Sequence, residues 1–97
     1  MDFLVRIELQ PRPDLSADLL QDLAVRESER GIELVESGHV VGIWRIPGRR
    51  GNVSIWRAKD PSELHQALES LPLYPWLLID VQALARHPVA SPLGELT

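Results

Sequence analysis

The chain has 97 residues, of which 44% are hydrophobic and 25% charged, the composition of one ordinary globular domain. Fourteen acidic residues against ten basic ones give a net charge of −4, which disfavours a nucleic-acid-binding protein because such proteins present a basic surface. The absence of cysteine excludes disulfides, thiol catalysis and thiolate metal sites. The sequence contains no apolar run of about eighteen residues, so no membrane-spanning helix is predicted, and the first residues do not resemble a signal peptide. We therefore expect a cytoplasmic domain.

The first two predicted elements are a strand and a long helix. Residues 3–9 alternate apolar and polar side chains, as a strand does, and Pro11 and Pro13 end it because proline lacks a ladder donor. An apolar arc with a period near 3.6 predicts a helix over residues 16–37, and Gly38 is its expected stop.

Two further strands, a second helix and a last strand follow. Residues 40–46 and 52–58 predict strands joined as a hairpin by a segment rich in turn formers. The sequence Asp-Pro-Ser-Glu at 60–63 is a capping-box pattern that begins a helix, and Pro72 is expected to end it. Residues 76–81 predict the last strand.

This order of elements predicts an α+β, ferredoxin-like βαββαβ fold over residues 1–86. Such a fold has a four-stranded antiparallel sheet with two helices on one face. The other face carries bulky apolar residues, so we expect it to pack on a second subunit. Residues 87–97 predict an irregular tail, and Val89 and Leu93 would gain by burial. We expect this tail to act as an intersubunit arm.

Glu27 stands out in the first predicted helix. It lies in the middle of the apolar arc, among Leu20, Leu23, Gly31 and Leu34. Burial there should raise the pKa of the carboxyl, which suits a general acid or base near neutral pH. The alternative is a structural ion pair that ties the helix to the sheet. The glycine one turn on leaves space beside the carboxylate, as a cavity requires.

Arg45 is the natural partner of this carboxylate. It is expected to share a strand face with Val41 and Ile43, where it either pairs with Glu27 or holds a substrate carboxylate by a two-pronged contact. His65 lies in the first turn of the second helix. It either carries a proton or donates a hydrogen bond to a substrate, or it is an ordinary surface histidine.

No motif predicts a bound metal or cofactor. The three histidines lack the spacing of metal ligands, and the glycines do not form a phosphate-binding loop. Ser54 has no nucleophile-elbow setting. The three tryptophans, Trp44 among them, are more typical of core and interface positions than of a base-stacking platform.

Several motifs also occur in an order that composition does not explain. They are Arg26-Glu27, Leu34, Gly38, Trp44-Arg45-Ile46, Gly48, Asn52, Ser54, Leu64-His65, Leu68, Leu71-Pro72-Leu73-Tyr74-Pro75 and Arg86-His87-Pro88. The series spans almost the whole chain and resembles the muconolactone Δ-isomerase family.

The resemblance implies a fold, an assembly and an activity. It implies a subunit that dimerises through its sheets into a dimeric α+β barrel, with such dimers assembled into a decamer. It also implies cofactor-independent isomerisation of muconolactone to the 3-oxoadipate enol-lactone in the β-ketoadipate pathway of aromatic catabolism, with no metal.

Roles for particular side chains are implied in the same way. Glu27 and His65 would be the catalytic residues, with Glu27 moving the proton. The residues expected to bind the substrate are Arg45, Trp44, Asn52, Ser54 and Arg86.

The chain departs from the family pattern at several positions. Ser28 and Arg30 stand where a lysine and a tyrosine are expected, and Arg49-Arg50 stands in place of His-Tyr in the hairpin. These departures leave open a different substituted lactone or a polyketide-like substrate for an isomerase, cyclase or dehalogenase. A non-catalytic oligomeric ligand binder is the further alternative.

Overall fold

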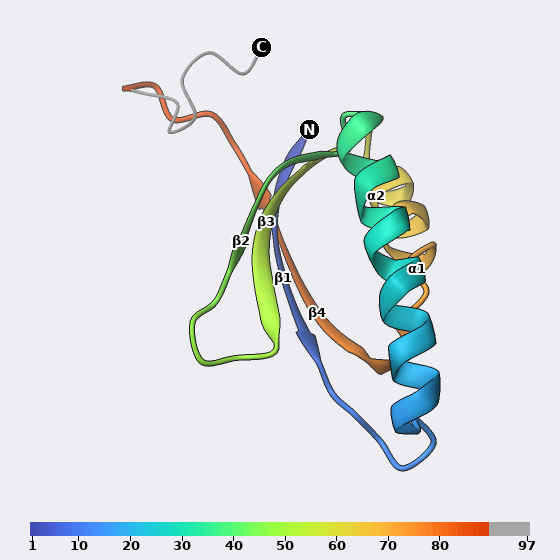
Figure 1. Ribbon diagram of the computed structural model, residues 1–97. Coiled ribbons are helices and arrows are strands. Elements are labelled where there is room, and N and C mark those ends of the chain that lie inside the picture. Colours follow the sequence, from blue (N-terminus) through green and yellow to red (C-terminus); the bar gives the residue numbers. More distant parts are fainter. Residues whose placement is uncertain (90–97) are drawn as a thin grey trace.

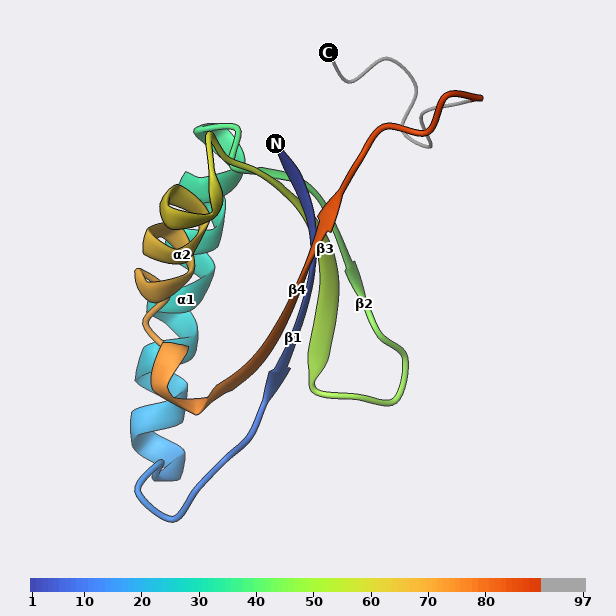
Figure 2. The same ribbon diagram turned by 180° about the vertical axis from the view of Figure 1, so that it is seen from behind.

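A computed structural model describes residues 1–89 and has the predicted α+β architecture, an antiparallel sheet with both helices on one face (Figure 1). The elements are β1 (Asp2–Leu9), α1 (Ala17–Glu36), β2 (Val40–Arg45), β3 (Gly51–Arg57), α2 (Pro61–Glu69), a short 3₁₀ helix (Tyr74–Trp76) and β4 (Leu77–Leu84). The four strands lie in the order β2-β3-β1-β4. From behind, the same two layers are visible, with the opposite face of the sheet uncovered (Figure 2).

The caps explain where the helices begin and where α1 ends. The Ser16 hydroxyl accepts a hydrogen bond from the Leu19 N–H at 3.1 Å, and Gly38 takes a φ of +85° just after α1, as expected of a helix stop. Asp60 caps α2 by accepting from the Glu63 N–H at 2.9 Å. The Glu63 carboxylate accepts from the Lys59 N–H, one residue before the expected donor of a capping box.

Two boundaries differ from the prediction by more than one residue. The second helix ends at Glu69, three residues before Pro72, because Ser70 caps it with its own N–H and the chain then turns toward β4. The last strand runs to Leu84 rather than Val81, because it pairs with the full length of β1, from Asp2↔Leu84 to Leu9↔Leu77.

The core lies between the sheet and α2. Phe3, Val5 and Ile7 alternate along β1 and point toward the helices, where all are buried. The other core residues are Leu34, Val40, Trp56, Ala58, Leu64, Ala67, Leu68 and Leu71. Leu34 is the one buried residue of α1, so this helix is only lightly packed on the sheet.

Residues 85–89 leave the sheet and run away from the body of the domain (Figure 1). All five are exposed, and Val89 is 85% exposed. Most of the predicted intersubunit arm at 87–97 lies outside the described residues. Over residues 1–89, neither helix has the length and apolar character needed to cross a membrane.

Candidate active site

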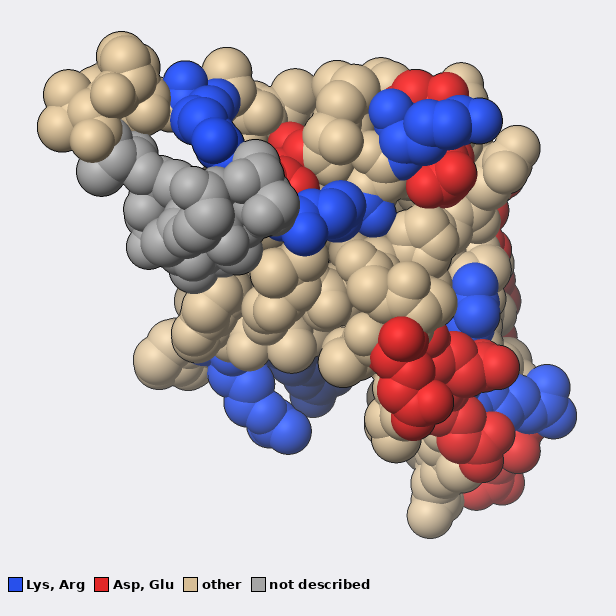
Figure 3. Space-filling model, turned by 90° about the horizontal axis from the view of Figure 1, so that it is seen from above, with Lys and Arg blue, Asp and Glu red and all other residues tan. Residues whose placement is uncertain are grey.

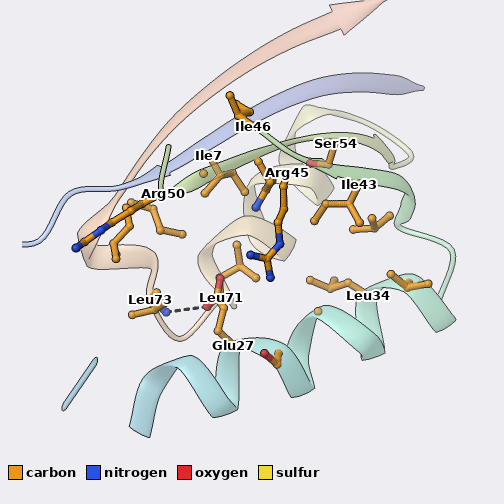
Figure 4. Close-up of a pocket in the computed structure, with 18 of the residues that line it drawn as sticks. Ile7, Glu27, Leu34, Ile43, Arg45, Ile46, Arg50, Ser54, Leu71 and Leu73 are labelled. Atoms are coloured by element: carbon orange, nitrogen blue, oxygen red, sulfur yellow. Dashed lines mark hydrogen bonds between the residues drawn. The ribbon is translucent and has the colours of Figure 1, made fainter. Parts of the chain in front are cut away.

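A cavity of about 1070 Å³ opens between α1 and the β2–β3 hairpin. Its floor is formed by β1 and β3, and one end is closed by the segment that joins α2 to β4. Figure 4 shows side chains from all of these elements pointing into it. The volume is at the upper end of the range of small-molecule sites, about 300–1,000 Å³.

Glu27 projects from α1 into this cavity (Figure 4). Its Oε1 accepts a hydrogen bond from the backbone N–H of Leu73 at 3.0 Å. Burial raises the pKa of the Glu27 carboxyl above its ordinary value of 4.5, and the Leu73 hydrogen bond lowers it in part. Within residues 1–89 the second carboxylate oxygen has no partner, so one oxygen is anchored and the other is available to a ligand.

Space beside Glu27 is provided by Gly31, as the sequence predicted. A Cβ built on Gly31 would meet no atom within 4 Å, although the residue lies on the inward side of α1 and lines the cavity. The carboxylate therefore lies next to open volume.

Arg45 faces the same cavity from β2, and Figure 4 shows it extending toward α1. In the described structure it forms no ion pair with Glu27, so the structural-pair alternative is not realised. The expectation that it shares a face with Val41 is wrong. The register shifts between Val40 and Gly42, so Arg45 and Ile43 share their face with Val40.

Asn52 and Ser54 lie on β3 at the cavity floor but differ in their hydrogen bonds. Asn52 pairs with Arg45 across the strands, and its Oδ1 is buried without a hydrogen-bond partner in the part of the chain that the structure describes. The Ser54 hydroxyl accepts from Trp56 Nε1 at 2.8 Å and donates to the Val5 carbonyl at 3.4 Å. Asn52 thus offers an unused amide, whereas the Ser54 hydroxyl is already engaged.

The structure does not bring three of the predicted site residues into the cavity. His65 is 62% exposed on α2, where its Nε2 lies 3.2 Å from Glu69. Trp44 lies on the opposite face of the sheet, its ring over Gly42. Arg86 follows β4 and is not among the residues that line the cavity. Over residues 1–89, no three acidic or histidine side chains are grouped to hold a metal ion.

Two groups at the site, the Leu73 N–H and Arg50, have no role in the sequence-based prediction. The Leu73 N–H, which anchors Glu27, was visible only as part of the Leu71–Pro75 motif. Arg50 lines the cavity. In the sequence it is notable only because Arg49-Arg50 stands where the family pattern has His-Tyr.

Charge is distributed unevenly around the cavity. Acidic side chains gather on one side of the molecule in Figure 3, and four acidic residues of α1 lie outside the cavity lining: Asp18, Asp22, Glu29 and Glu33. The hairpin side of the cavity carries arginines instead: Arg45, Arg49 and Arg50. The cavity therefore presents cations opposite the carboxylate of Glu27.

Comparison with known proteins gives one consistent result. A family model described as muconolactone delta-isomerase matches residues 1–90. The chain is 38% identical over 88 residues to the muconolactone Delta-isomerase of Acinetobacter baylyi, covering 91% of this chain and 92% of that one. It is 34% identical to the enzyme of the same name from Rhodococcus opacus, over 88% and 91% of the two chains. A crystal structure of muconolactone isomerase superposes with a TM-score of 0.85 at 31% identity, over 93% and 94% of the chains.

Proposed function

The chain belongs to the muconolactone delta-isomerase family, and from that premise we propose that it isomerises muconolactone to the 3-oxoadipate enol-lactone, without a cofactor. The observation that carries the proposal is the half-buried Glu27, anchored at one oxygen and open to the cavity at the other. A base of raised pKa in that position suits removal of a carbon-bound proton near neutral pH.

The reaction moves one proton and one double bond. The ionised Glu27 takes the proton from the ring carbon that bears the acetate side chain, a proton made acidic by conjugation with the lactone carbonyl. The electron pair moves into the ring and gives a dienolate with its charge on the carbonyl oxygen. Protonated Glu27 then returns the proton to the carbon next to the carbonyl, so the carboxylate is restored and no atom is gained or lost.

Arg45 and Asn52 supply the other contacts that this reaction needs. The guanidinium of Arg45 has no hydrogen-bond or ion-pair partner within residues 1–89 and matches the geometry of a substrate carboxylate. The Asn52 amide is its cross-strand neighbour, and its N–H groups are suited to the dienolate oxygen. His65 and Trp44 have no part in this scheme because both lie outside the cavity.

The direct test is a spectrophotometric assay of the purified protein with muconolactone and no added metal or cofactor. Glu27→Gln keeps an acceptor for the Leu73 N–H but cannot take a proton, so kcat should fall by about 10²–10⁴-fold. Glu29→Gln, a change of the same kind on an exposed site of α1, is the matched control and should keep its activity. An active Glu27→Gln variant would contradict the assignment of the base.

The pH profile gives an independent test of the same group. Because the ionised form is the base, kcat/KM should rise with pH through the pKa of Glu27. Burial raises that pKa, so the midpoint of the rise should lie above 4.5. A midpoint at or below 4.5 would exclude Glu27 as the titrating base.

The proposal includes an assembly, a pathway and a compartment. We propose that two copies pack sheet to sheet, as in a dimeric α+β barrel, and that such dimers form a decamer in the cytoplasm that serves the β-ketoadipate pathway. Large apolar residues support the sheet contact, since Trp44, Leu78 and Leu84 are 49%, 48% and 39% exposed on the face without helices. Light scattering should give a decamer of the 10.9 kDa chain, and Trp44→Glu with Leu78→Glu should lower the mass.

A further inference from the structure

The arginines of the β2–β3 hairpin are not equivalent. Arg49 is held by Glu8 through three hydrogen bonds, from Nε at 3.1 Å and from Nη2 at 2.7 and 2.8 Å. All three arginines are exposed and line the cavity, but Arg45 and Arg50 form no hydrogen bond or ion pair within residues 1–89. The site therefore offers two free guanidinium groups.

Arg49 also lines the cavity, but its guanidinium is bound to Glu8, and backbone geometry explains why Arg50 lies on the cavity side of the sheet. Gly51 pairs with Glu8 on the outer face of the sheet, and Asn52 faces the helices, so strand alternation places Arg50 on the same side as Asn52. The Arg50 carbonyl also accepts a hydrogen bond from the Leu9 N–H at 2.9 Å, which fixes its backbone to β1. A Cβ on Gly51 would collide with the Ile7 carbonyl, so the two chains are in close contact here.

The two free arginines occupy different parts of the cavity. Figure 4 shows Arg45 near its middle, directed at the helix that carries Glu27, and Arg50 at one end, on the side of Leu73. A single small carboxylate held by Arg45 would leave Arg50 without a partner. The acidic residues that line the cavity are Glu27, which is anchored to Leu73, and Glu36, at the far end of α1.

We propose that Arg50 is a specificity residue that gives the site a second anion position beside Arg45, so that a lactone with two carboxylates binds more tightly than a lactone with one. This inference rests on the proposed function, because it assigns the substrate class of the same site. Muconolactone carries one free carboxylate, which uses one guanidinium. A second carboxylate on the ring or its side chain would neutralise the other by a charge-assisted contact. The cavity of about 1070 Å³ has room for the larger molecule.

The test uses binding rather than turnover, with two saturated γ-lactones that differ only in having one or two carboxylates. Calorimetry on the wild-type protein should show tighter binding of the dicarboxylate by about tenfold or more. Arg50→Gln should remove most of that preference. Arg50→Lys should keep part of it, because lysine keeps the positive charge but cannot make the two parallel hydrogen bonds of a guanidinium. Arg6→Gln removes the same charge from the opposite face of the sheet and should preserve the preference.

Three results would overturn the proposal: equal wild-type affinity for the two lactones, an unchanged preference in Arg50→Gln, or an equal loss in Arg6→Gln. The last would mean that the net charge of the protein, and not contact with Arg50, sets the preference. The muconolactone assay stays separate from this test. A protein that binds the dicarboxylate through Arg50 but does not isomerise muconolactone would contradict the proposed substrate and leave the second anion position intact.

Discussion

The two sides of the helix layer are packed very differently. Where α2 covers β1 and β3, Phe3, Val5 and Leu64 are at most 2% exposed. Where α1 faces β2, Ile32, Val35 and Ile43 are 58%, 52% and 56% exposed, and a cavity separates the two elements. We call these the packed side and the open side. The packed side holds the fold together, so the open side is free to keep a carboxylate and two arginines beside an unfilled volume.

The largest difference between the sides should appear in stability. Phe3 is 2% exposed among core residues, so Phe3→Ala should lower the free energy of unfolding by about 3–5 kcal/mol. Ile32→Ala removes a side chain that is 58% exposed and should cost less than about 1 kcal/mol. Urea denaturation at one protein concentration measures both. Similar losses would show that another surface covers the open side in solution.

A second contrast separates two neighbouring residues of β3. Asn52→Ala removes an amide whose Oδ1 has no partner among residues 1–89, so kcat/KM should fall by about 100-fold while stability changes by less than about 1 kcal/mol. Ser54→Ala should do the reverse. It leaves the Trp56 indole N–H buried without an acceptor, at a cost of about 1–3 kcal/mol, with little change in the rate per folded molecule.

Kinetics and denaturation on the same two variants measure this contrast. If Asn52→Ala lost stability and kept its rate, Asn52 would belong to the packed side. A Ser54→Ala variant that stayed stable but lost its rate would place the serine hydroxyl among the reacting groups.

The packed side was largely predictable from the sequence, because its alternating and helical patterns record which face is buried. Phe3, Val5 and Ile7 show this directly. The raised pKa of Glu27 was predictable for the same reason, since a carboxylate inside an apolar arc must be partly desolvated.

The open side was harder to predict, because its contacts depend on local backbone detail. A register shift between Val40 and Gly42 decided which residues share a face with Arg45. The hydrogen bond to Glu27 comes from the backbone N–H of Leu73, which any residue other than proline could supply. The imidazole of His65 could carry a proton, which favoured a catalytic role, yet the rotation of α2 directs the side chain to solvent.

The smallest predicted effect concerns Gly31, and its sign tests whether the open side is open. Glycine within a helix costs about 0.5–1 kcal/mol relative to alanine, and a Cβ at this position meets nothing within 4 Å. Gly31→Ala should therefore raise the free energy of unfolding by about 0.5–1 kcal/mol, whereas Gly31→Phe should fill the cavity and raise KM. If Gly31→Ala were destabilising, the helix penalty could not explain it, because that term favours alanine. The volume beside Glu27 would then have to be occupied in solution, and the carboxylate would be a packed group instead of an accessible base.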